Sequence, residues 1–185
     1  MLASMAEENA DVIREMLKAF SRGDVDGVLA GFDPRCELHE PPEMVETAGY
    51  HGHDGIRAWM ANLRQVGAIV FEPVHFSGSG DIVVCEVAGR GRGQASGAPF
   101  DWSTWAVFEM RDARIVRVRA FLAQEEAQKA AGSIAERPQP RPGGLLRRRK
   151  GEGMGVRRPL PLAAVKVVQP LSGREVELSA PLRAH

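Results

Sequence analysis

The spacing of apolar residues changes near residue 68, and this change restricts what the chain can fold into. Before that point, apolar side chains recur every three or four residues, which is the period of a helix with one buried face. After it, they follow the two-residue period of a strand through four runs. Helices in the first part and antiparallel strands in the second predict the α+β class, with a curved sheet that carries helices on one face.

Capping and turn residues delimit three expected helices. The first covers residues 10–20 and ends before Gly23, because glycine readily adopts the left-handed backbone that stops a helix. Asp24 is suited to cap a short second helix over 25–32, which the Asp33-Pro34 pair closes. The stretch "GYHGHDGIRAW" leads into a third helix, in which Asp54 is expected to cap the first turn.

The expected strands cover residues 36–40, 69–76, 82–93, 100–110 and 114–123. Pro73 places the second of these at a sheet edge or a bulge, because proline cannot donate to the ladder. Residues 111–113 form a tight turn between the last two strands. The "GRGRG" stretch at 89–93 looks like an RNA-binding Arg-Gly segment, but its position within a strand favours a bulged strand end.

Charge and aromatic residues divide the chain near Gly132. Residues 1–132 hold 13 Lys+Arg and 20 Asp+Glu, a net −7, whereas residues 133–185 hold 11 and 4, a net +7. All seven Phe, three Trp and one Tyr lie between Phe20 and Phe121. We therefore expect a flexible N-terminus over 1–7, one folded domain over 8–132, and a basic Pro/Gly/Arg-rich tail over 133–185. The tail is expected to be largely disordered, because it cannot bury enough apolar surface to offset its ordering entropy.

Neither the cysteines nor the apolar runs indicate export or membrane insertion. Cys36 and Cys85 lack metal or redox spacing and lie in apolar strand-like runs, so both are expected to be small buried residues. No run approaches the ~20 apolar residues of a membrane span, and the N-terminus lacks a signal-peptide core. These features predict a cytoplasmic protein. The basic run "LLRRRKGEG" is a candidate nucleic-acid contact, although a solvated tail is the favoured interpretation.

The element order and three stretches resemble one superfamily. The stretches are "AFSRGDVDGVLAGFDPRCELHEPPE", "YHGHDGIRAWM" and "RDARIVRVRAFLAQEEAQKAAG". Over residues 8–132 the chain is similar to the SnoaL-like branch of the nuclear transport factor 2 superfamily, which includes polyketide cyclases and ketosteroid isomerase-like proteins. The resemblance implies a cone-shaped domain in which a curved mixed or antiparallel sheet carries three N-terminal helices on its concave side. It also implies an apolar pocket open at one end and a homodimer formed through the outer sheet face.

Glu40, directly before Pro41, is the candidate catalytic residue that this resemblance implies. In the ketosteroid isomerase-like pattern, a carboxylate at this place is the general base that moves a proton beside a carbonyl. An apolar pocket raises the pKa of such a carboxyl towards working pH. The pattern also has a tyrosine on helix one, where this chain has Met16, and a protonated acid near Asp101. A rim glutamate in a polar loop is the alternative for Glu40.

Several other residues are candidates to line a ligand pocket. They are Tyr50, Trp59, Met16, Phe20, Trp105 and Asp101. The sequence leaves open which sheet face Asp101, Trp102 and Trp105 occupy. His39 should face away from Glu40, because neighbouring strand residues point to opposite faces. Arg117, Arg119 and Glu109 are expected to form cross-strand pairs on an outer or dimer face rather than an anion site.

No metal or cofactor is expected. Zinc takes three or four protein ligands, and the His51–His53 pair supplies two. The first functional hypothesis is a domain that binds a small, mostly apolar molecule and acts as a cofactor-free isomerase, cyclase, hydratase or dehydratase. A non-catalytic ligand-binding or dimerisation module is the second. An interaction protein whose basic tail contacts nucleic acid or a partner is the third, and whether the chain is an enzyme stays open.

Overall fold

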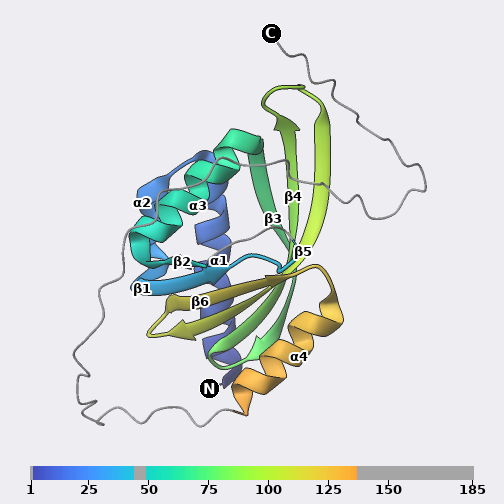
Figure 1. The fold of residues 1–185 in the computed structure, drawn as a ribbon. Coiled ribbons are helices and arrows are strands. Elements are labelled where there is room, and N and C mark those ends of the chain that lie inside the picture. Colours follow the sequence, from blue (N-terminus) through green and yellow to red (C-terminus); the bar gives the residue numbers. More distant parts are fainter. Residues whose placement is uncertain (1, 44–48, 137–185) are drawn as a thin grey trace, which may run out of the picture.

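A computed structural model of the chain describes residues 2–43 and 49–136, with side chains from Met5 onward. Helices pack on a strongly curved sheet, and one long hairpin projects beyond them (Figure 1). This arrangement confirms the predicted α+β class and the curved sheet. The predicted disorder of residues 137–185 and the basic run within them lie outside the described residues. Among the described helices, none is both long and apolar enough to cross a membrane.

Helices α1 (Leu2–Arg22) and α2 (Val25–Ala30) open the fold. α1 begins at Leu2, so helical backbone extends through the segment that the sequence analysis treated as a flexible N-terminus. It ends before Gly23 as predicted, and Gly23 has a φ of 73°. Asp24 caps α2 as predicted, because its carboxylate accepts a hydrogen bond from the Gly27 amide at 2.9 Å.

The second helix is shorter than predicted. It ends at Ala30, and Phe32 opens strand β1 (Phe32–His39), which includes Pro34. The Ile115 amide donates to the Gly31 carbonyl at 2.8 Å, so the chain has joined the sheet before Pro34 is reached. Phe32 is 1% exposed. Its apolar side chain suits the helical stripe and the sheet core equally well, and pairing with the last strand decides between them.

Helix α3 (Gly52–Val66) carries the predicted apolar stripe but begins earlier than expected. His51 precedes its first turn, and its side chain makes no capping hydrogen bond. Asp54 lies inside the helix and pairs with Arg57 at 2.9 Å, so the predicted cap at Asp54 is wrong. Gly52, with a φ of 65°, provides the turn into the helix.

The strands form one six-stranded sheet in the order β2–β1–β6–β5–β4–β3. The other strands are β2 (Tyr50–His51), β3 (Gly67–Ser79), β4 (Ile82–Gly93), β5 (Pro99–Arg111) and β6 (Arg114–Phe121). The sheet is mixed, because β1 and β6 pair in parallel and all other neighbours are antiparallel. β3 lies at the edge, and its register shifts between Pro73 and His75, as the proline predicted.

The β5–β6 turn agrees with the sequence prediction, whereas the end of β4 differs from it. Asp112 and Ala113 have φ values of 50° and 55° in the tight β5–β6 turn, the positive values that match the twist of a hairpin. The predicted bulge at residues 89–93 is wrong. β4 pairs with β5 without a register shift from Ile82 to Arg92, so "GRGRG" is regular strand.

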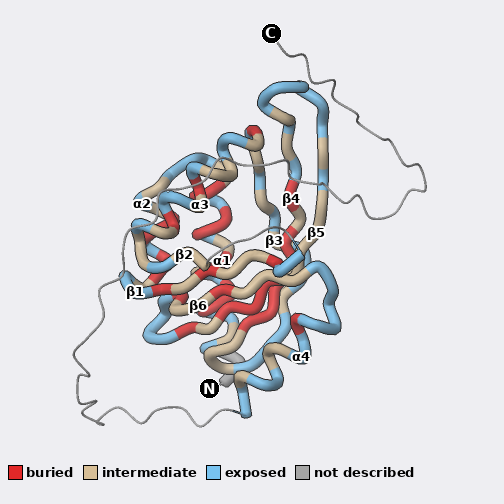
Figure 2. Tube along the Cα trace, in the orientation of Figure 1, coloured by how far each residue is buried: buried red, intermediate tan, exposed pale blue. Residues whose placement is uncertain are grey.

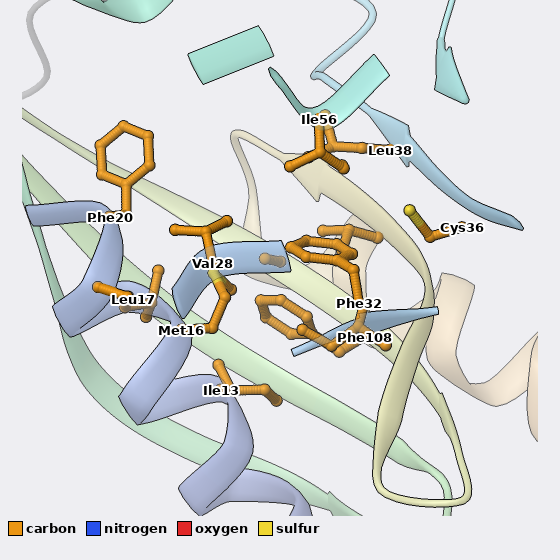
Figure 3. Packing of buried hydrophobic residues seen from close by; sticks show 14 of the residues in the cluster. Ile13, Met16, Leu17, Phe20, Val28, Phe32, Cys36, Leu38, Ile56 and Phe108 are labelled. Atoms are coloured by element: carbon orange, nitrogen blue, oxygen red, sulfur yellow. The ribbon is translucent and has the colours of Figure 1, made fainter. Parts of the chain in front are cut away.

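The main core lies between the helices and the concave face of the sheet. Helix α1 contributes Ile13, Met16, Leu17 and Phe20, which face Val28 of α2 and side chains of the sheet (Figure 3). Figure 2 shows the buried residues concentrated in the sheet and on the inward sides of the helices, whereas the hairpin tip is exposed. Cys36 and Cys85 are both 0% exposed, which confirms their predicted burial. Burial raises the pKa of the Cys36 thiol to about 11 and that of Cys85 to about 12.

A fourth helix, α4 (Gln124–Ala135), packs on the outer face of the sheet, the face turned away from α1–α3. Ala127 is fully buried there, in one cluster with Val84 and Val107, and Trp105 packs against the same cluster. The homodimer expected from the resemblance would cover the apolar residues of this face with a partner, and α4 covers this part of them instead. The predicted boundary at residue 132 falls inside this helix.

Candidate functional site

Glu40 follows the last residue of β1 and lies beside buried Pro41. Its carboxylate accepts hydrogen bonds from the Trp59 indole and the Tyr50 hydroxyl. Burial raises the pKa of Glu40 above its ordinary value, and the bonds from Trp59 and Tyr50 lower it by less. The site therefore holds a carboxyl whose protonated and ionised forms are closer in free energy at neutral pH than those of a solvated glutamate.

Tyr50 links this carboxyl to helix α3. The Asn62 side-chain amide donates to the Tyr50 hydroxyl oxygen at 3.2 Å. Burial raises the pKa of Tyr50, the Asn62 bond lowers it, and the charge of Glu40 raises it further. A chain of hydrogen bonds thus runs from Asn62 through Tyr50 to Glu40. These contacts join helix α3 to the end of β1, and we call Glu40, Tyr50, Trp59 and Asn62 the carboxyl cluster.

Aromatic rings continue from the carboxyl cluster into the concave side of the sheet. The Trp59 ring lies 5.2 Å from that of Phe20 and 6.3 Å from that of Phe71, measured between centroids. Phe20 and Phe71 are 4.7 Å apart. Trp59 therefore contacts the carboxyl through its indole N–H and joins it to a group of apolar rings. This is the combination that binds a mostly apolar molecule and orients it by a few polar contacts.

The structure brings together some of the predicted pocket residues and separates others. Tyr50, Trp59 and Phe20 gather near Glu40. Met16 is 4% exposed in the main core, where it packs close to Gly31. Trp105 lies on the outer face under α4. Asp101 is exposed and lies opposite Arg90 in the register, so neither Trp105 nor Asp101 joins the carboxyl cluster.

The sequence left the face of Trp102 open and gave no prediction for Asn62. Trp102 lies on the concave side, because its ring meets that of Phe71 at 5.8 Å. Strand alternation alone left its face open, since apolar residues occur on both faces of β5. The only sequence signal for Asn62 is its spacing. It follows Trp59 by three residues on α3, so the two side chains lie next to each other on one helix face.

The outer face carries the expected cross-strand charges. One carboxylate oxygen of Glu109 lies 3.6 Å from both Arg117 and Arg119, and Glu37 lies 2.8 Å from Arg117. The Arg117 guanidinium lowers the pKa of Glu37. His39 shares this face, with its Nε2 3.5 Å from Glu37, so it is directed away from Glu40 as predicted.

A separate cleft of about 280 Å³ opens on the helical side, between the ends of α1 and α3 and the start of β3. Its lining includes Phe20, Leu63 and Ile69 but not Glu40, Tyr50 or Trp59. Phe20 forms the partition, because its ring lines the cleft and also contacts Trp59. The cleft is therefore distinct from the carboxyl cluster, and the chemistry of the latter is the better guide to function.

The two histidines before α3 point to different places. His53 has its Nε2 3.2 Å from the Phe32 carbonyl, whereas His51 is exposed and its ring lies 6.3 Å from that of His39. Within residues 2–43 and 49–136, no group of three or more His, Cys, Asp or Glu side chains is placed to hold a metal ion.

Residues 13–118 match the family described as SnoaL-like domain, which is more than half of the chain. The chain belongs to this family. No curated protein matches the SnoaL-like chain in sequence. The predicted resemblance to the SnoaL-like branch of the nuclear transport factor 2 superfamily is thus confirmed.

Solved structures share the fold of this SnoaL-like chain at low sequence identity. An NTF2-like protein of unknown function from Burkholderia pseudomallei is 23% identical, with a TM-score of 0.56, over 67% of this chain and 97% of that one. A putative SnoaL-like polyketide cyclase from Jannaschia is 16% identical, with a TM-score of 0.56, over 72% and 96%. SalBIII, an epoxide hydrolase/cyclase-like enzyme of salinomycin pyran ring formation, is 18% identical, with a TM-score of 0.55, over 64% and 93%.

Proposed function

We propose that this SnoaL-like domain binds a small, mostly apolar molecule beside the carboxyl cluster and that Glu40 transfers a proton within it. The observation that carries the proposal is the environment of Glu40. A partly buried carboxyl with a raised pKa is held by Tyr50 and Trp59 and lies next to apolar rings. Among the neighbours of the fold are a putative polyketide cyclase and an epoxide hydrolase/cyclase-like enzyme, and proton transfer by a carboxyl, without a cofactor, suits the site of this chain.

The proposed step uses both protonation states of Glu40. As a carboxylate it accepts a proton from a carbon next to a carbonyl, and as a carboxylic acid it returns that proton to the same or another atom. A raised pKa favours both halves, because it makes the carboxylate a stronger base and keeps the acid form accessible near neutral pH. The Tyr50 and Trp59 donors hold the carboxylate in one orientation, so that the carboxylate needs less reorientation before it can accept a proton.

The experiment follows hydrogen exchange at carbon, so it needs no knowledge of the overall reaction. A thermal-shift screen of apolar carbonyl compounds first identifies ligands, and ¹H NMR in D₂O then measures loss of the signal from protons next to the carbonyl. Wild-type protein should accelerate this loss, and Glu40→Gln should bind the ligand without accelerating it. Glu43→Gln is the matched control, because Glu43 is exposed and lies near in sequence. Equal acceleration by wild type and Glu40→Gln would remove Glu40 from the proton transfer, and exchange no faster than in buffer would leave a non-catalytic binding module as the function.

A second candidate function, homodimer formation through the outer face, is favoured by the charges there. Glu37, Arg117, Glu109 and Arg119 form a row of partly buried side chains in mutual contact across three strands. Removing paired charges from water at an interface costs less free energy than removing isolated charges. Sedimentation analysis should show a dimer that Arg117→Glu weakens, because that change places three acidic groups together. A monomeric wild-type protein would reject this second candidate.

A further inference from the structure

Strand β3 lies at one edge of the sheet, so one side of its backbone has no neighbouring strand. The Phe71 amide donates to the Ser21 hydroxyl oxygen at 3.1 Å, so Phe71 directs its amide away from β4 and towards helix α1. In an antiparallel ladder, alternate residues direct their amide and carbonyl groups to opposite sides. Gly67 and Ile69 therefore present these groups at the open edge as well.

The open edge is closed on both sides of Ile69. On one side, the Ser21 hydroxyl oxygen also lies 3.3 Å from the Phe71 carbonyl oxygen, so α1 occupies the edge there. On the other side, the Gly67 amide donates to the Leu63 carbonyl at the end of α3. Within the part of the chain that the structure describes, the outward amide and carbonyl of Ile69 have no hydrogen-bond partner. The edge can thus accept an extended segment of a few residues.

The cleft on the helical side opens at this same position. Its lining combines residues 67–70 of β3 with the last turns of α1 and α3. Arg22 and Arg64 are among the lining residues, and none of the described residues that line the cleft is Asp or Glu. The Arg64 guanidinium donates to the Gly23 carbonyl at 2.9 Å, which holds its charge beside the cleft. The open edge therefore lies in a positively charged cleft.

The two sides of this edge differ in character. Ile69 packs against the main core on the concave side, so its neighbour Val70 points to the outer face, where it is 43% exposed. Arg22 and Arg64 come from the helices, which cover the concave side. A segment added beside Ile69 would direct alternate side chains to these two sides. The best fit is a segment with acidic residues next to the arginines and apolar residues next to Val70.

One segment of the chain beyond the described residues has this pattern. Residues 174–178 lie within "GREVELSAP", in which acidic and apolar residues alternate between a glycine and a proline, as is typical of a strand. Only three acidic residues follow α4 in the sequence, and two of them are Glu175 and Glu177. In an extended backbone these two point to one side, and Val176 and Leu178 point to the other.

The connection to this segment is long enough to reach the cleft. The described chain ends at Glu136, so residues 137–173, 37 in number, lie between it and the segment. A random coil of that length has a root-mean-square span of about 35 Å. A compact domain of this size is about 35 Å across. Tethering gives an effective concentration on the order of 1 mM, so a weak intrinsic affinity is sufficient.

We propose that residues 174–178 bind the cleft of their own chain as a short strand added to β3 beside Ile69, with their acidic side chains at Arg22 and Arg64. Strand addition of this kind takes its affinity from backbone hydrogen bonds and its specificity from alternate side chains. The inference does not depend on the proposed proton transfer, because Glu40 does not line the cleft.

The test follows the Ile69 amide by solvent-exchange NMR on the full chain. Pairing with the added strand should slow exchange of this amide with water. Exchange in wild type should be about two- to tenfold slower than in a variant that carries Glu175→Lys and Glu177→Lys. Both substitutions lie outside residues 2–136, so the domain itself is unchanged. The Val70 amide, which belongs to the β3–β4 ladder, should exchange slowly in both proteins.

Glu152→Lys is the matched control, because it removes the other acidic residue that follows α4 and should leave Ile69 exchange as in wild type. Arg22→Glu should abolish the slowing, and its combination with Glu175→Lys and Glu177→Lys should restore it. Equal Ile69 exchange rates in wild type and the Glu175→Lys, Glu177→Lys variant overturn the inference. Slowing that disappears on dilution also overturns it, since the cleft would then hold the segment of a second copy.

Discussion

Removal of the Tyr50 hydroxyl tests the carboxyl cluster directly. In Tyr50→Phe, Glu40 loses a donor and the Asn62 amide loses its acceptor. A hydrogen bond to a charged group contributes about 1.5 to 3 kcal/mol, and a neutral one about 0.5 to 1.5 kcal/mol. Because the cluster is only partly buried, the lower ends apply, so the free energy of unfolding should fall by about 2 kcal/mol at pH 8.

The same substitution made in Glu40→Gln isolates the bond between the two residues. There both lost bonds are neutral, so Tyr50→Phe should cost about 1 kcal/mol, and the coupling between the sites is about 1 kcal/mol. The coupling should shrink as the pH falls through the pKa of Glu40, since the charged acceptor is then lost. Urea unfolding followed by tryptophan fluorescence measures each free energy. Equal costs of Tyr50→Phe in both backgrounds at pH 8 would refute the hydrogen bond on which the site depends.

Three further predictions follow from the charges and from the outer face. Tyr50 is the sole tyrosine, so absorbance titration reports its pKa alone, and Glu40→Gln should lower that pKa because a nearby negative charge is removed; an unchanged titration curve would contradict the contact. Arg117 lowers the pKa of Glu37 in the folded state, so Arg117→Met should lower the free energy of unfolding at neutral pH. The loss should be less than about 1 kcal/mol, because both side chains are 34% exposed, and it should vanish as the pH falls through the Glu37 pKa. A loss that persists in acid would point to packing instead. Ala127→Asp places a carboxylate in a fully buried contact and should release α4, measured as faster amide hydrogen exchange throughout that helix; unchanged protection would show that α4 is held elsewhere.

Capping and hairpin signals in the sequence were sufficient to predict most of the helices and strands. The predictions that were wrong have physical reasons. The boundary near 132 cut α4 because its buried stripe is made of small residues. Ala127, Ala130, Ala131 and Ile134 follow the helical period, but alanines add little to a count of apolar residues. Phe32 was assigned to the wrong element because one apolar residue satisfies a helix and a strand equally, and only its pairing with Ile115 separates them.

The candidate site was predictable in one part and not in the other. Glu40, Tyr50 and Trp59 come from a short section of sequence, and all three were predicted as site residues, Glu40 as the catalytic carboxylate and the other two as pocket lining. The place of Trp102 needs the register of β4 against β5, which pairs Gly89 with Trp102 and Gly91 with Phe100. Alternation within "FDWSTW" could not reveal whether Trp102 or Trp105 faces inward. The glycine pattern of the neighbouring strand was the signal that decides it, once the two strands are aligned.

The parallel pairing of β1 with β6 has a consequence for how the domain acquires its structure. β1 is made early, and its local neighbour β2 is only two residues long, whereas its main partner β6 is the last strand of the sheet. During synthesis, β1 must wait for nearly the whole domain before this pairing can form, and such distant contacts slow folding. A chain that stops after β5 would retain every residue of the carboxyl cluster yet leave the strand before Glu40 without its main partner. The site should therefore appear only when the final strand is in place.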